Sequence, residues 1–109
     1  MHEYSLIQAL VDRVEHETRG RGKVHRVRVK LGELSGVDAQ LLATAYETFK
    51  PATVCADAAL ELTQVCAQWS CRICGRTIVR GDRLQCCGSP ARLMQGDDLV
   101  LDQIELEVP

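Results

Sequence analysis

The cysteines at positions 71–87 constrain the fold of this chain more than any other feature. Cys71 and Cys74 are separated by two residues, and Gly75 follows directly. Two thiolates at this spacing can bind one metal ion while the backbone between them turns back, and a glycine after the second cysteine makes that turn easier to form. We therefore predict a zinc site that holds this part of the chain together as a small module.

The second half of the predicted site is less regular, because Cys86 and Cys87 are adjacent. A tetrahedral zinc site needs four sulfurs at about 2.3 Å from the metal, and neighbouring cysteines can both reach one ion only with an awkward local backbone. The alternative fourth ligand is Cys66, whereas Cys55 is expected to be a small buried residue. The predicted zinc ligands are Cys71, Cys74, Cys86 and Cys87.

Other uses of these thiols fit the sequence less well. The chain begins Met-His-Glu-Tyr-Ser, without the basic region, apolar run and cleavage site of a secretory signal. No stretch reaches the roughly 18 apolar residues that span a bilayer. We expect a cytoplasmic protein with no membrane partner, whose cysteines are reduced or bind metal. A thioredoxin-like redox pair would stand at the start of a helix within a βαβ pattern, which the surrounding sequence lacks.

Apolar periodicity outlines the remaining elements. A helical stripe predicts an amphipathic helix over residues 5–18. A second helix is predicted after its cap Asp38, with an apolar stripe of Leu41, Leu42, Ala45, Tyr46 and Phe49. Pro51 ends the second helix. Alternation of apolar and polar residues predicts strands at 26–31, 60–63 and 104–108.

These elements predict an α+β fold in which two helices lie on a three-stranded sheet and the cysteine-rich segment is inserted. The expected division is an α/β domain of residues 1–65 and 91–109, and a zinc module of residues 66–90. The outer face of the first strand is basic and that of the last strand is acidic. Because opposite charges facing across a sheet are mildly stabilising, we expect these two strands to be neighbours.

Charge and aromatic content bear on an alternative function, a zinc-ribbon module that binds nucleic acid. The basic strand face and the arginines of the insert (Arg72, Arg76, Arg80 and Arg83) favour it. The formal net charge of −2 disfavours it, since a nucleic-acid-binding domain usually carries a basic excess. No aromatic residues interleave these arginines to stack bases. We therefore expect no nucleic-acid partner.

His2 has distinctive chemistry, although a histidine at this position is usually only a solvated terminal residue. The terminal amine of Met1, the amide nitrogen of His2 and its imidazole Nδ1 can close two fused chelate rings on one metal ion. Planar nitrogen ligation of this kind suits Ni(II) or Cu(II) rather than zinc. Glu3 can add an oxygen ligand.

The order and spacing of several motifs resemble the hydrogenase nickel-incorporation proteins, the HypA/HybF family. The resemblance runs the full length of the chain, which makes it more specific than any one motif. The matching segments are Met1-His2-Glu3, residues 31–37, residues 45–49, Cys71-x-x-Cys74-Gly75, residues 87–90 and residues 96–107.

The resemblance implies a nickel metallochaperone rather than an enzyme. It implies a transient Ni(II) site at Met1, His2 and Glu3, with His2 indispensable, and a separate structural zinc. Asp38 matches a carboxylate that can lie near the nickel, but we expect it to be the helix cap. The family usually has Cys-x-x-Cys-Gly-Ser at the second cysteine pair, so Cys86 takes the first position only if two residues are missing here.

The resemblance also implies partners. These are a hydrogenase-maturation GTPase, the [NiFe]-hydrogenase large subunit and, in some organisms, urease maturation proteins. The chain has no Gly-x-x-x-x-Gly-Lys-Ser/Thr loop, so nucleotide hydrolysis belongs to a partner. The sequence leaves open whether the protein is a monomer or a homodimer, and which hydrogenase or urease it serves.

Overall fold

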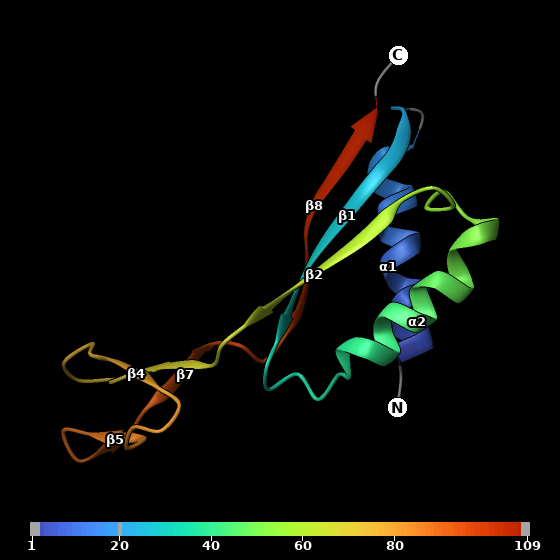
Figure 1. Ribbon diagram of the computed structural model, residues 1–109. Coiled ribbons are helices and arrows are strands. Elements are labelled where there is room, and N and C mark those ends of the chain that lie inside the picture. Colours follow the sequence, from blue (N-terminus) through green and yellow to red (C-terminus); the bar gives the residue numbers. More distant parts are fainter. Residues whose placement is uncertain (1–2, 20, 108–109) are drawn as a thin grey trace.

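A computed structural model describes residues 3–19 and 21–107 of the chain. Figure 1 shows two lobes, a larger one of helices on a sheet and a smaller one built of short strands. The molecule measures 55 × 30 × 17 Å and its radius of gyration is 17.3 Å. A compact domain of this length would have a radius of gyration of about 13 Å, so the protein is elongated.

The two predicted helices are present. Helix α1 is Glu3–Thr18 and helix α2 is Ala39–Phe49, followed by the 3₁₀ turn Lys50–Ala52. The carboxylate of Asp38 accepts hydrogen bonds from the backbone N–H groups of Gln40 and Leu41, at 2.9 and 3.0 Å. Asp38 therefore caps α2, as its sequence position predicts. The buried apolar side chains of the helices are Ile7, Leu10, Val11, Val14, Leu42, Ala45 and Tyr46.

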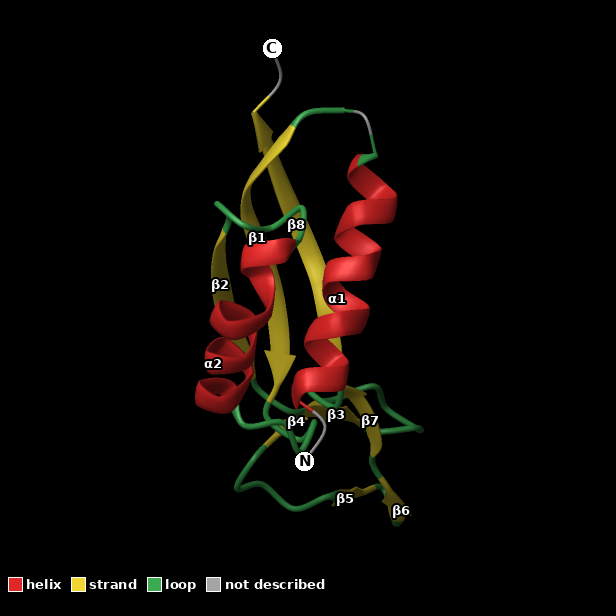
Figure 2. Ribbon diagram, turned by 90° about the vertical axis from the view of Figure 1, so that its right-hand side faces the viewer, coloured by secondary structure: helices red, strands yellow, loops and turns green. Residues whose placement is uncertain are grey.

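The sheet beneath the helices has three strands in the order β2-β1-β8. Strand β1 is Lys23–Gly32, β2 is Ala59–Val65 and β8 is Leu99–Glu107; β1 pairs parallel with β2 and antiparallel with β8. Figure 2 shows both helices on one face of this sheet. The predicted arrangement of two helices on a three-stranded sheet is confirmed.

The inner face of β1 supplies the centre of the core. Val24, Val27, Val29 and Leu31 are each no more than 2% exposed. Val24 and Val27 lie three residues apart, and a register shift against β8 falls between Val24 and Arg26. This irregularity changes the simple alternation, so that both valines face inward. The core is mainly aliphatic, and Tyr46 is the one aromatic side chain that is fully buried among the described residues.

The outer face of the sheet carries the charged ladder that the sequence predicts. The Arg26 guanidinium lies 3.0 Å from the Glu61 carboxylate and 3.3 Å from that of Glu105, and Arg28 contacts the same two carboxylates at 3.2 and 3.4 Å. The basic face of β1 therefore lies beside the acidic face of β8. These side chains are at least one-third exposed, so each pair contributes only about 0.2–1 kcal/mol to stability.

The smaller lobe contains a second three-stranded sheet, in the order β4-β3-β7. Strand β3 is Gln68–Ser70, β4 is Thr77–Val79 and β7 is Arg92–Gln95, and the two-stranded hairpin of β5 (Gln85–Cys86) and β6 (Ser89–Pro90) completes the lobe. Strand β7 pairs with β3, so this sheet continues beyond residue 90, where we placed the end of the zinc module. The division into residues 1–65 and 91–109 against 66–90 stays a prediction.

Glu33 joins the two lobes. It follows β1, and its carboxylate accepts a hydrogen bond from the backbone N–H of Ala67 at 2.5 Å and another from the Arg80 guanidinium at 3.0 Å. The Ala67 N–H, followed by Arg80, holds the pKa of Glu33 below its usual range. Gly32 directly precedes Glu33, and a Cβ atom at position 32 would lie 2.3 Å from the backbone of Gly96. The lobes therefore meet through a close backbone contact and one ionised side chain.

Candidate metal sites

The turn that holds the first cysteine pair is built as the sequence predicts. The Cys71 sulfur lies 3.4 Å from the backbone nitrogen of Ile73 and 3.5 Å from that of Cys74, each of which donates to it. Gly75 has a φ of +77°, in the left-handed region, and its N–H donates to the Cys71 carbonyl at 3.0 Å. Glycine adopts this conformation without a steric penalty. The turn directs both sulfurs to the same side.

The adjacent cysteines adopt the awkward backbone that the sequence predicts. Cys87 has a φ of +54°, and it is the only non-glycine residue with positive φ in the described part of the chain. Gly88 follows with a φ of +73°. An L-residue in this region costs roughly 1–2 kcal/mol. The two left-handed residues reverse the chain after β5 and bring the Cys87 sulfur back beside that of Cys86.

The four sulfurs form one cluster with the dimensions of a tetrahedral thiolate site. The Sγ atoms of Cys74 and Cys86 lie 3.7 Å apart and those of Cys86 and Cys87 lie 3.8 Å apart. All four Sγ atoms, including that of Cys71, are within 4.8 Å of one another. Zinc–sulfur bonds of 2.3 Å at tetrahedral angles would separate the sulfurs by about 3.8 Å. Cysteine thiolates bind zinc and other soft metals rather than Mg²⁺ or Ca²⁺, so the cluster fits a structural zinc site.

The thiols of the cluster differ in acidity without a metal. Hydrogen bonds from the backbone N–H groups of Cys74 and Ile73 lower the pKa of Cys71 to about 6. The pKa of Cys86 is raised by its interactions with the sulfurs of Cys71 and Cys74. Interactions with Cys86 and then Cys71 raise the pKa of Cys87 to about 12. Closely spaced sulfurs cannot all ionise unless a cation joins them, and a divalent metal ion supplies that charge.

The other two cysteines lie outside this cluster. Cys66 is exposed between β2 and β3, and its backbone carbonyl accepts a hydrogen bond from the Gln95 side chain at 3.0 Å. Cys55 is fully buried in the core of the larger lobe, where desolvation raises the pKa of its thiol. The expectation that Cys55 is a small buried residue is confirmed. The structure gathers Cys86, and not Cys66, with the remaining predicted ligands.

The N-terminal motif is only partly within the described structure, since Met1 and His2 lie outside the described residues. Glu3 begins α1 and is 6% exposed. Its carboxylate lies 3.4 Å from the backbone nitrogen of Asp38, which donates to it. The backbone N–H of Glu3 itself, aided by that of Asp38, holds the pKa of Glu3 below its usual range. The structure therefore brings together Glu3 and Asp38, the two acidic residues singled out near the predicted nickel motif.

Glu33 contacts the smaller lobe through its side chain, a role that was not predicted from the sequence. Nothing in the local sequence distinguishes its carboxylate from the other exposed acidic groups. A signal was available in its position, because Glu33 directly follows the last residue of a predicted strand and a glycine. The partners of its side chain, Ala67 and Arg80, are far away in sequence and only the fold brings them close.

The sequence pattern of one protein family matches residues 1–106 of this chain. That family is described as "Hydrogenase/urease nickel incorporation, metallochaperone, hypA". The chain belongs to the HypA family of nickel metallochaperones, which act in hydrogenase maturation. The resemblance in the sequence is thereby confirmed over nearly the whole chain.

Individual HypA proteins are similar over their full length. The hydrogenase maturation factor HypA of Shewanella halifaxensis (strain HAW-EB4) is 37% identical over 113 residues, covering 98% of each chain. The protein of the same name from Wolinella succinogenes is 36% identical over 98% of this chain and 96% of its own. These matches therefore span nearly the whole of both chains in each pair.

Solved HypA structures share the fold. The solution structure of the Ni metallochaperone HypA from Helicobacter pylori aligns with a TM-score of 0.77 at 29% identity and covers all of both chains. A second solution structure of a HypA protein aligns with a TM-score of 0.79 at 28% identity, over 98% of this chain and 97% of the other. The mixed α and β architecture with a cysteine cluster is therefore the HypA architecture. None of the helices in the described residues is both long and apolar enough to cross a membrane.

Proposed function

We propose that this protein binds one Ni(II) ion at its N-terminus and delivers it for the maturation of a [NiFe]-hydrogenase. The ligands in this proposal are the imidazole of His2, the terminal amine of Met1 and, as a further oxygen ligand, Glu3. The observation that carries the proposal is that the HypA family pattern matches from residue 1, so the Met-His-Glu segment lies within it. Nickel here is cargo, which the protein must bind and then release.

The donor atoms of the N-terminal residues differ from those of the cysteine cluster, which supports separate tasks for the two metals. Nitrogen ligands from a terminal amine and an imidazole suit Ni(II), and a site of few ligands at a chain end leaves positions open for transfer. Four thiolates form a closed site whose metal stabilises the fold. We propose Cys71, Cys74, Cys86 and Cys87 as the ligands of that structural zinc.

Glu3 and Asp38 have roles in this proposal that differ in kind. Asp38 positions the start of α2, because its carboxylate binds the N–H groups of Gln40 and Leu41. Glu3 adjoins His2 in sequence, and the Asp38 N–H holds one of its carboxylate oxygens at 3.4 Å. The ionised carboxylate is thus kept beside the proposed nickel-binding residues, where it favours binding of a divalent cation.

The proposed partners follow from the family. They are a hydrogenase-maturation GTPase, the large subunit of a [NiFe]-hydrogenase and, where urease is a client, urease maturation proteins. We propose that the protein is not an enzyme and that it works in the cytoplasm as a monomer or a homodimer. Energy from nucleotide hydrolysis would come from the GTPase.

Isothermal titration of untagged protein with Ni(II) tests the nickel site. The native chain should bind one Ni(II), and His2→Ala should abolish that binding, as should one residue added ahead of Met1, because both changes remove the chelate. His16→Ala and His25→Ala are matched controls, since both histidines are exposed and lie elsewhere. Nickel binding by His2→Ala equal to that of the native chain would exclude the N-terminal assignment.

The nickel affinity should fall in mild acid. The terminal amine titrates near pH 7.7–8.0 and histidine near pH 6.5. Both must lose a proton to bind metal, so protons compete with nickel as the pH decreases through these values. Titrations at about pH 8 and pH 6 measure this loss, and equal affinity at both would contradict amine and imidazole ligation.

A further inference from the structure

Four of the five arginines of the smaller lobe form no ion pair within the described residues, unlike the basic residues of the larger sheet. Residues 66–95 contain five arginines and one aspartate, Asp82. Within the described part of the chain, only Arg80 of these five forms an ion pair, the one with Glu33. On the larger sheet, by contrast, Arg26, Arg28 and Lys30 are all paired. The smaller lobe therefore presents positive charge that nothing in the described structure compensates.

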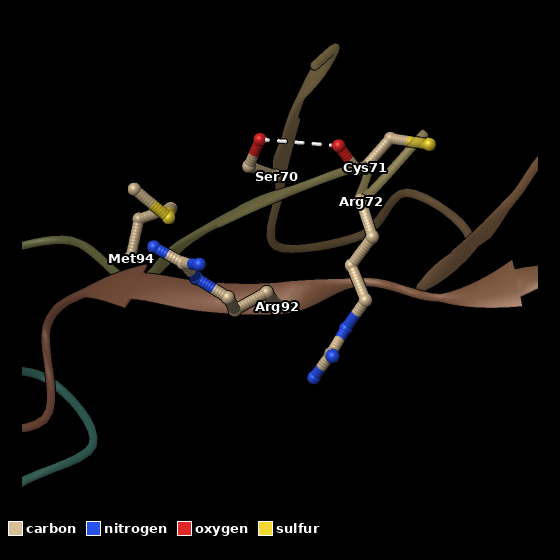
Figure 3. Close-up of a pocket in the computed structure, with 5 residues that line it drawn as sticks. All are labelled: Ser70, Cys71, Arg72, Arg92 and Met94. Carbon is tan, nitrogen blue, oxygen red and sulfur yellow. Dashed lines mark hydrogen bonds between the residues drawn. The ribbon is translucent and has the colours of Figure 1, made fainter. Parts of the chain in front are cut away.

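Two of these arginines line one groove. It has a volume of about 360 Å³ and is lined by Ser70, Cys71, Arg72, Arg92 and Met94. Figure 3 shows that Arg92 and Met94 project from the same strand, while Arg72 extends from the turn of the first cysteine pair. In Figure 3 the Arg92 guanidinium lies toward Met94, while the Arg72 guanidinium points away from both. Each guanidinium is suited to a carboxylate of its own, which arginine binds in a planar, two-pronged geometry.

The groove lies on the face of the small sheet, where Ser70 of β3 pairs with Arg92 of β7. In the described structure the order is β4-β3-β7, so β7 beside the groove is an edge strand. Its other edge can hydrogen-bond to an added extended segment. Arg92 and Met94 are two residues apart, so they share one face of β7. A segment added here would present alternate side chains to an arginine and then to a methionine.

The surroundings of the groove favour a protein over a nucleic acid. Met94 is 54% exposed and Ile73, in the cysteine turn, is 66% exposed. Arginine and methionine are enriched in protein interfaces, whereas single-stranded nucleic acid is bound by stacking on aromatic side chains. Trp69 is the only aromatic residue of this lobe, and it is half-buried in β3.

We propose that the β7 edge and its groove form a docking site for an acidic, extended segment of a partner protein. Carboxylates of that segment pair with Arg92 and with Arg72, and an apolar side chain of the segment packs against Met94. The segment adds to the small sheet as a further strand. This interaction goes beyond nickel delivery and does not require nickel. The docking proposal and the nickel proposal can therefore be tested, and rejected, independently.

Fluorescence anisotropy with the zinc-loaded full chain tests the docking site. The probe is a labelled twelve-residue peptide that repeats Glu-Thr-Leu-Thr, which places Glu and Leu alternately on one face of a strand. The native chain should bind this peptide, and binding should weaken as salt is added. A peptide with Lys in place of Glu and a twelve-nucleotide oligothymidylate should bind at least about tenfold more weakly, because neither matches both the charge and the apolar pattern.

The variants locate the binding site. Arg72→Gln with Arg92→Gln should weaken peptide binding at least about tenfold, because two charge-assisted contacts are lost. Arg19→Gln with Arg21→Gln removes the same charge from an exposed segment of the larger lobe and should leave binding unchanged. Met94→Thr removes the apolar contact and should weaken binding severalfold. Zinc content and circular dichroism establish that each variant is folded.

Three outcomes would overturn the proposal. These are no binding of the acidic peptide by the native chain, equal peptide binding by the Arg72→Gln, Arg92→Gln variant, and oligothymidylate binding as tight as that of the peptide. The last result would identify a nucleic-acid surface instead.

Discussion

Cys87 shows how a metal ion can stabilise a backbone that its sequence disfavours. Its φ of +54° costs roughly 1–2 kcal/mol. Structural zinc binding to small folded peptides contributes about 10 kcal/mol or more at neutral pH, so one metal site outweighs this strain several times over. Bound zinc therefore stabilises this turn by much more than the strain destabilises it, and loss of zinc should loosen the turn of β5 and β6.

Serine substitution distinguishes the two candidates for the fourth zinc ligand. Cys86→Ser should lose zinc to a chelator much faster than the native protein, because it removes a sulfur from the cluster. Cys66→Ser should retain the native zinc content, because Cys66 lies outside the cluster. Elemental analysis after dialysis against a chelator measures both. Zinc loss from Cys66→Ser with retention in Cys86→Ser would reverse the assignment.

Zinc binding should release protons in a number that the thiol acidities determine. At pH 7 Cys71, with its pKa lowered to about 6, is already mostly ionised, whereas Cys87 keeps its proton because its pKa is raised to about 12. The pKa of Cys86 is also raised. Zinc displaces at least the protons of Cys86 and Cys87, so affinity falls as the pH falls. Calorimetry in buffers of different ionisation enthalpy should find at least two protons released per zinc; fewer would contradict these acidities.

At the scale of elements, the junction between the lobes depends on Glu33. Its carboxylate is the acceptor for one backbone N–H and one arginine across that junction. Because its folded pKa is lowered, the contact is complete at neutral pH and is lost only as the pH falls through that lowered value, below about 4.3. The Glu33 contact across the junction is thus insensitive to pH in the physiological range.

Glu33→Ala should let the lobes reorient independently, since it removes the two side-chain contacts that Glu33 makes across the junction. Nitrogen-15 relaxation should show separate tumbling of β3–β7 and of the helices, while zinc content and helix signals stay native. Glu17→Ala is the control, because Glu17 pairs with Arg13 on the exposed side of α1. Relaxation in Glu33→Ala equal to that of the native protein would show that the Glu33 contacts do not set the orientation of the smaller lobe.

The long elements could be predicted from sequence and the short ones could not. Strand β1 and both helices carry enough apolar residues for their period to be visible. Strands β3 and β4 have three residues each, too few to show alternation. Strand β8 begins at Leu99, earlier than the predicted start at residue 104. The early part could not be recognised by alternation, because Leu99-Val100-Leu101 is an unbroken apolar run. Similarly, the residue types and spacing predicted the cysteine cluster, but not the φ of Cys87 that closes it.

At the scale of the whole molecule, helix α1 and the sulfur cluster belong to different lobes of an elongated protein. Helix α1 packs on the larger sheet, and the sulfur cluster lies in the smaller lobe (Figure 1). Full-length similarity to HypA structures indicates that this two-lobed arrangement belongs to the family.

X-ray absorption at the nickel and zinc edges of untagged protein tests the central claim most directly. The native chain should show one nickel with nitrogen and oxygen ligands and no sulfur, together with one zinc bound by four sulfurs. His2→Ala should lose the nickel signal and keep the zinc signal unchanged. Sulfur ligands on nickel, or nickel retained by His2→Ala, would contradict the division between a transfer site at the N-terminus and a structural site in the cysteine cluster.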